Sequence, residues 1–121
     1  MPFITLMTNL GRSALPADIM PRLIDQLAGV LKKPAVNFNW VLETDKTMSQ
    51  GRDNSHVPVI WLKIEAVNSF REESCVVELT PKIYNSFTES LKIPEDQVIM
   101  TFNNLEPINV ARLGKSLADK S

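Results

Sequence analysis

The sequence predicts an α/β (α+β) fold in which a strand–helix–strand unit occurs twice and builds a four-stranded mixed sheet with two helices on one face. The first observation is a repeated motif, LKKP at 31–34 and LKIP at 91–94. The second is that each copy ends an amphipathic stretch and is followed within a few residues by an alternating stretch. A motif repeated in the same context indicates an internal duplication.

The length bounds the domain organisation. A chain of 121 residues is long enough for one two-layer core and too short for two independent cores. We therefore expect a single domain over residues 1–121, with repeats at about 1–56 and 57–113. The tail at 114–121 is polar and is expected to fray.

The first helix is predicted over residues 20–31, where apolar side chains recur every three or four positions. These side chains are Met20, Leu23, Ile24, Leu27, Ala28 and Leu31. Asp18 is a suitable N-cap, and Pro34 marks the end of the helical segment.

The second helix carries a similar stripe at Val76, Leu79, Ile83, Phe87 and Leu91. Pro81 falls inside it, so either one helix kinks there or Thr80 caps a fresh helix with Pro81 at its first position. We expect the kinked single helix.

Strands are predicted at 3–8, 36–42, 59–67 and 98–103, and the polar segment 43–57 is the main loop. Because each half reads strand, helix, returning strand, we expect parallel pairing with right-handed crossovers within each half.

The third predicted strand has apolar residues on both faces, with Val59 and Trp61 opposite the Ile60 face. A two-layer monomer would leave one such face in water. This pattern favours oligomerisation through the sheet or its edges.

Composition excludes several classes of function. The 13 basic and 14 acidic residues leave a net charge of -1 without a basic block, so nucleic acid is not an expected partner. No segment has the ~20 apolar residues that span a bilayer, and the start lacks a signal-peptide pattern, so we expect neither membrane insertion nor a signal peptide. The one cysteine, Cys75, suits a reducing cytosol and is expected to be a half-buried apolar residue.

The residue most suggestive of catalysis is Pro2, which follows Met1 at the start of the first strand. If Met1 is removed, Pro2 carries a rigidly held secondary amine. A free α-amine titrates near ~7.7–8.0, and an apolar pocket or nearby cations lower this pKa further. Such an amine can take a proton from carbon. The alternative is that Pro2 is simply a proline tolerated as the first residue of a strand.

A set of short motifs accompanies the N-terminal proline and the doubled unit, namely TNL at 8–10, LP at 15–16, KP at 33–34 and LE at 105–106. In this order and over nearly the whole chain they resemble the macrophage migration inhibitory factor and D-dopachrome tautomerase family. The opening MPF and the late LE followed by RLG at 112–114 are closer to the D-dopachrome tautomerase branch.

The resemblance implies a homotrimer whose sheets surround a central channel, with active sites at the subunit interfaces. It implies cofactor-free keto–enol tautomerisation of small aromatic carbonyl compounds, such as phenylpyruvates and dopachrome, and no metal. Pro2 matches the catalytic base, Lys33 the cation that meets the substrate's acidic group, and Val67 a residue lining the pocket. The face of the last strand that carries Ile99 and Thr101 is expected to meet the neighbouring subunit's proline.

The chain departs from the family pattern at several positions. Ile99 and Thr101 stand where the inhibitory-factor branch has tyrosine and asparagine, and Asn68 stands where a glycine is typical. These changes affect substrate range and turnover rather than the base. A Cys-x-x-Cys pair is missing from the stretch 59–62, which excludes a thiol oxidoreductase. Lys33 also has another explanation, since a lysine at a helix C-terminus is stabilised by the helix dipole.

A second class of function stays open. The chain is also consistent with a secreted, cytokine-like ligand of an invariant-chain type receptor, with a vestigial pocket, and a purely structural trimer is a third possibility. We expect the protein in the cytoplasm and also secreted without a signal peptide. His56 is expected to be a solvated loop residue.

Overall fold

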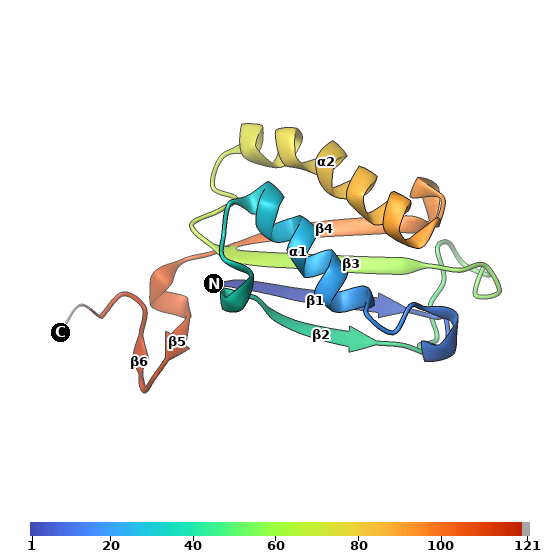
Figure 1. Ribbon diagram of the computed structural model, residues 1–121, viewed down its shortest axis with the longest axis horizontal. Helices are drawn as coiled ribbons and strands as arrows, with labels where there is room; N and C mark the ends of the chain where they lie inside the picture. The colour runs from blue at the N-terminus through green and yellow to red at the C-terminus, as the bar shows by residue number, and fades with distance from the viewer. Residues whose placement is uncertain (120–121) are drawn as a thin grey trace.

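Four strands form one mixed sheet in the computed structural model, which describes residues 1–119 apart from the side chains of Ser86, Phe87 and Ser90. The sheet order is β2-β1-β3-β4, with β1 at Pro2–Thr8, β2 at Asn39–Glu43, β3 at Ile60–Val67 and β4 at Val98–Leu105. The helices α1 (Ile19–Leu31) and α2 (Glu73–Leu91) both cover one face, as Figure 1 shows. The predicted fold class is confirmed.

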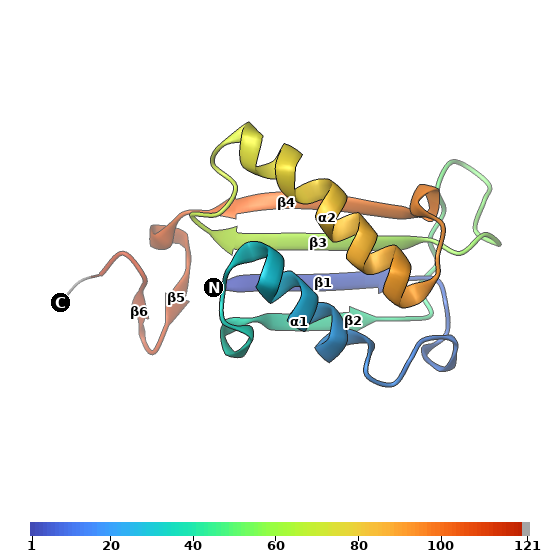
Figure 2. The same ribbon diagram turned by 45° about the horizontal axis from the view of Figure 1, so that its top comes forward.

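Strand pairing follows the two halves of the chain. Strand β1 is parallel to β2 and β3 is parallel to β4, whereas β1 and β3 join the halves in antiparallel register. The N-terminus lies at the same end of the sheet as the small hairpin of β5 (Ala111–Arg112) and β6 (Lys115–Ser116), and the loop between β2 and β3 lies at the other end (Figure 2).

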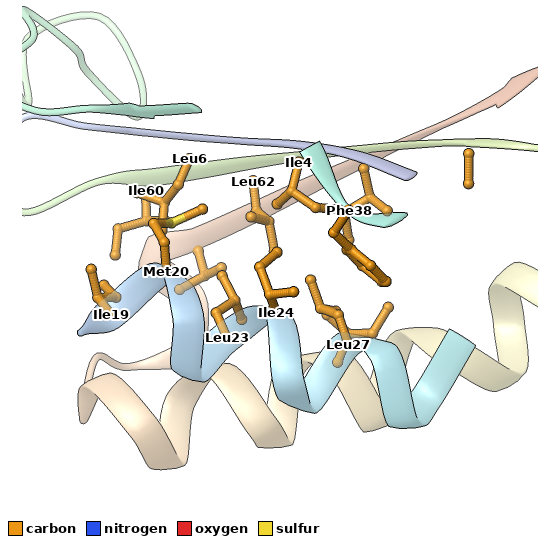
Figure 3. Packing of buried hydrophobic residues seen from close by; sticks show 14 of the residues in the cluster. Ile4, Leu6, Ile19, Met20, Leu23, Ile24, Leu27, Phe38, Ile60 and Leu62 are labelled. Carbon is orange, nitrogen blue, oxygen red and sulfur yellow. The ribbon is translucent and has the colours of Figure 1, made fainter. Parts of the chain in front are cut away.

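The core lies between the sheet and α1, whose predicted stripe points at β1 and β3 (Figure 3). On β3 every second residue is fully buried, namely Ile60, Leu62, Ile64 and Ala66. Burying a Leu or Ile side chain stabilises a fold by about 1.5–3 kcal/mol, so this alternation fixes which face of β3 lies under the helices.

Helix α2 is one continuous helix that contains Pro81, as the single-helix prediction requires, and no fresh helix begins at Thr80. The Thr80 hydroxyl donates a hydrogen bond of 2.6 Å to the carbonyl of Val76 one turn back. The helix begins earlier than its apolar stripe, at Glu73. Phe87 of that stripe is outside the described side chains.

The prediction for the second strand was wrong at its start. Residues Ala35–Asn37 form a 3-10 turn after Pro34, and β2 begins only at Asn39. Val36, which the alternation assigned to the strand, is 88% exposed. The turn keeps the period-two spacing of the apolar residues, which is why the sequence pattern did not distinguish it from strand.

Two further expectations need correction, and a third holds in part. Cys75 is exposed rather than half-buried. Asp18 occupies the predicted N-cap position of α1, but its carboxylate pairs with Arg22 at 2.9 Å and makes no capping hydrogen bond. In the tail, Lys115–Ser116 is ordered as β6 rather than frayed, because it pairs with β5.

The uncovered face of the sheet is mixed rather than broadly apolar. Trp61 lies on it and is 39% exposed, but Lys63 and Glu65 follow it on the same face of β3. Val59, expected beside Trp61, is buried just before the strand begins. The exposed apolar side chains on this face include Trp61, its pairing partner Ile99, and Val41 on the outer strand β2.

Thr8 anchors the loop between β2 and β3 to the end of β1. Thr8 is fully buried. Its hydroxyl donates a hydrogen bond to the Val59 carbonyl at 2.8 Å and accepts one from the Leu10 N–H at 3.1 Å. Its own carbonyl accepts from the Lys46 N–H at 3.0 Å. Both ends of the loop are thus tied to one residue.

Replacing Thr8 by valine should lower the free energy of unfolding by about 1–3 kcal/mol, because it leaves the buried Val59 carbonyl and Leu10 N–H without their partner. Thr5→Val on the same strand is the matched control and should change stability by less than about 0.5 kcal/mol. Denaturant unfolding at fixed protein concentration measures both. Equal stabilities for the two variants would contradict the anchoring role.

Candidate active site

Pro2 is the first residue of a central strand and its side chain is fully buried. In β1 it pairs with Ala66 of β3, one residue before Val67. With Met1 present the Pro2 nitrogen is an amide, and it becomes a secondary amine only when Met1 is removed. The backbone nitrogen is therefore held at one defined corner of the sheet.

The electrostatics of this corner favour a neutral amine. Burial, and to a smaller extent the positive charge of Lys33, lower the pKa of the Met1 α-amine from its ordinary value. In the described part of the chain no carboxylate forms a salt bridge with Lys33. Its ammonium group is thus available to an anionic ligand beside the chain start.

The end of α1 brings Lys33 to this position. Lys32 adopts a left-handed conformation with φ 56°, and the Lys33 N–H donates to the Ala28 carbonyl at 3.1 Å. These two features end the helix and turn the chain back toward the sheet. Pro34 follows and prevents further helix.

Val67 is half-buried at the end of β3, where it pairs with Leu105 of β4. The next residue, Asn68, has φ 55°, and its N–H donates to the Leu105 carbonyl at 3.0 Å. Asparagine is one of the few residues that tolerate this conformation. The turn after β3 therefore forms without the glycine that is typical at this position.

A cleft of about 350 Å³ adjoins Lys33, between the end of α1 and the first half of α2. Its charged lining consists of Lys32, Lys33, Lys82 and Glu78, so its charge is mainly positive. An excess of cations attracts anionic ligands to this cleft beside Lys33.

Ile99 lies near the opposite end of the sheet from Pro2, and Thr101 lies in the middle of β4. Ile99 pairs with Trp61, and Pro2 pairs with Ala66, five residues further along β3. At about 3.3 Å per residue, Ile99 is separated from Pro2 by about 16 Å along the strands, and Thr101, which pairs with Lys63, by about 10 Å. One copy of the chain therefore does not bring Ile99 and Thr101 to Pro2, Lys33 and Val67.

A second cavity, of about 380 Å³, surrounds Ile99 and Thr101. It is lined by Thr47, Met48, Ser49, Val59, Trp61, Ile99 and Thr101. Sequence reasoning missed Trp61 and the loop residues as part of this site. Alternation does place Trp61 on the open face, but only the pairing of β3 with β4 sets it beside Ile99.

Other kinds of site receive no support from the described residues. Across residues 1–119, no group of three or more histidine, cysteine or acidic side chains is arranged to hold a metal ion. None of the helices described there is long and apolar enough to span a membrane. His56 is exposed in the loop before β3.

Comparison with known proteins links this geometry to one family. The family model described as macrophage migration inhibitory factor (MIF) matches residues 1–118. The D-dopachrome decarboxylase-B of Xenopus laevis is 30% identical over 114 residues, which cover 94% of this chain and 95% of that protein. The MIF-like protein mif-2 of Caenorhabditis elegans is 28% identical over 123 residues, covering 98% and 97%.

A solved structure has the same fold. The macrophage migration inhibitory factor from Trichinella spiralis superposes with a TM-score of 0.82 at 22% identity, covering 94% of this chain and 98% of that chain. Since the family model spans nearly the whole chain and the relatives align over its length, this chain belongs to the macrophage migration inhibitory factor family.

Proposed function

We propose that this protein is a cofactor-free keto–enol tautomerase of small aromatic carbonyl compounds, and that the Pro2 amine is its base once Met1 is removed. The proposal rests mainly on the surroundings of Pro2 at the end of the sheet where β1 begins. There the chain start is held in a buried strand, and burial and Lys33 lower the pKa of the Met1 α-amine, so we expect the same surroundings to lower the pKa of the Pro2 amine once Met1 is removed. The relatives named for D-dopachrome support a substrate of that class.

The reaction needs only a proton to move. The neutral Pro2 amine accepts a proton from the carbon beside the carbonyl group, and the electron pair of that C–H bond forms the carbon–carbon double bond. A proton then adds to the carbonyl oxygen, which gives the enol without change of oxidation state. Lys33 binds the substrate's carboxylate and helps to keep the amine unprotonated.

The protein is proposed to work as a homotrimer, in which the pocket around Ile99 and Thr101 of one copy meets the Pro2 corner of the next. The separation of Ile99 from Pro2 by about 16 Å within one copy supports this arrangement. The outer strands β2 and β4 also leave pairing edges, and β2 exposes Trp40 and Val41. Edges and apolar residues of this kind are commonly covered by other subunits.

A receptor-binding role with a vestigial pocket is the alternative, and Ile99 favours it. Its aliphatic, partly exposed side chain stands where the inhibitory-factor branch has a tyrosine. In this alternative the protein acts on a cell-surface receptor after secretion without a signal peptide, alongside a cytoplasmic pool. A Met1-free trimer without tautomerase activity would favour this function over the enzyme.

Pro2→Gly should lower kcat/KM for phenylpyruvate by about 10²–10⁴-fold while the fold is retained, because a positioned base contributes a factor of this size. A primary amine remains in this variant, which explains a residual rate. Intact mass spectrometry must first establish that Met1 is absent, and circular dichroism checks the fold. Full activity in Pro2→Gly, or in protein that retains Met1, would exclude Pro2 as the base.

Lys33→Ala should raise KM for carboxylate substrates and move the rising limb of the pH–rate profile to higher pH. The active amine is unprotonated, and removing a nearby cation favours its protonated form, so its pKa rises. Arg22→Ala at the other end of α1 removes the same charge and is the matched control. A lysine that only stabilises the helix end would instead cost ~0.3–1 kcal/mol of stability and leave KM and the pH profile unchanged.

A further inference from the structure

We propose that the Trp61 indole packs against the aromatic ring of the substrate, and that this contact selects substrates that carry a planar aromatic group. This inference rests on the proposed function, since it assigns the substrate's ring to the pocket that meets the next copy's Pro2. It adds a specificity-determining residue to the base and the cation, and it names where the uncharged end of the substrate binds.

A hydrogen bond to the neighbouring strand restrains the Trp61 side chain. Trp61 pairs with Ile99 in the β3–β4 register, and its indole Nε1–H donates to the Thr101 Oγ1 at 3.2 Å. The side chain is nevertheless 39% exposed, so part of the indole faces the cavity rather than the core. An indole that is restrained by a hydrogen bond and partly exposed offers an apolar surface that loses less side-chain entropy when a ligand binds.

The lining of the cavity matches an uncharged ring. Among the described residues, those around it are three hydroxyl side chains and four apolar ones, and none of these is charged. Met48 adds a thioether, which makes favourable contacts with aromatic rings. The volume of about 380 Å³ lies in the range of small-molecule sites.

Charge separates the two halves of the site. The cleft beside Lys33 carries three lysines and one glutamate, whereas the cavity beside Trp61 offers no cation to a carboxylate. A ring-bearing acid therefore has one favourable orientation, with its carboxylate at one copy's Lys33 and its ring on the next copy's Trp61.

Thr101 gains a defined role from the same contact. Its hydroxyl oxygen accepts the indole N–H, and a threonine hydroxyl that accepts one hydrogen bond still has a proton to donate. Trp61 is thus also a positioning residue for Thr101. Because Ile99 has no ring, the aromatic surface of this half of the site is supplied by Trp61.

The chain contains two tryptophans, Trp40 and Trp61. When Trp40 is replaced by phenylalanine, indole fluorescence reports on Trp61 alone. In a Trp40→Phe background, the Met1-free protein is titrated with 3-phenylpropanoate and with 3-cyclohexylpropanoate, and the indole emission is followed. The two acids share the carboxylate and chain length and differ in the aromaticity of the ring. We expect a saturable change with the phenyl acid at concentrations about two- to tenfold lower than with the cyclohexyl acid.

A second experiment measures KM and kcat for phenylpyruvate in Trp61→Leu and Trp61→Phe, each made in the otherwise native chain. Trp61→Leu should raise KM for phenylpyruvate by about two- to tenfold with a smaller effect on kcat, and Trp61→Phe should recover most of the affinity because it keeps a ring. Sedimentation of both variants checks that assembly is unchanged.

The outcomes separate the inference from the proposed function. An active enzyme whose Trp61 emission does not respond to the phenyl acid, or which binds both acids equally, overturns the role of Trp61. A ring-selective response in a protein without tautomerase activity supports the aromatic pocket and counts against the enzyme instead. Equal KM values for Trp61→Leu and the native chain would likewise overturn the inference.

Discussion

The arrangement of the whole molecule depends on the burial of one face of β3 beneath the two helices. Ile60, Leu62, Ile64 and Ala66 are fully buried, and this pattern permits only one register. A shift by one residue would drive Trp61, Lys63 and Glu65 under the helices. The same register pairs Pro2 with Ala66 and Trp61 with Ile99, so the packing of the core determines where the two halves of the site lie.

Sequence periodicity predicted the parts of the fold that depend on a buried stripe. The helix with Leu23 and Leu27 and the strand with Leu62 follow their patterns, because burial at a fixed spacing stabilises one element only. The 3-10 turn at Ala35–Asn37 was missed, since its apolar residues alternate as a strand's do. The exposure of Cys75 was also missed, because a single residue type does not reveal its neighbours.

The residues of the candidate site also fall into those that the sequence predicts and those that it does not. Pro2 and Lys33 are suggested by chemistry that is local in sequence, a chain start and a helix end. Trp61 is not, because its role depends on a hydrogen bond to a residue 40 positions away. The contrast between a cationic cleft and an uncharged pocket likewise emerges only when α1 lies beside α2 and β3 pairs with β4. Long-range pairing is the information that a periodicity argument lacks.

Subunit mixing tests the central proposal, a site shared between two copies of the chain. Pro2→Gly and Ile99→Glu are each made, and the two impaired proteins are unfolded, combined and refolded together. In a trimer with shared sites, a copy with native Pro2 meets a copy with native Ile99 at about one site in four, so activity should reappear in the mixture. If every site is formed within one copy, each site keeps a defect, and a mixture as inactive as its components would contradict the account.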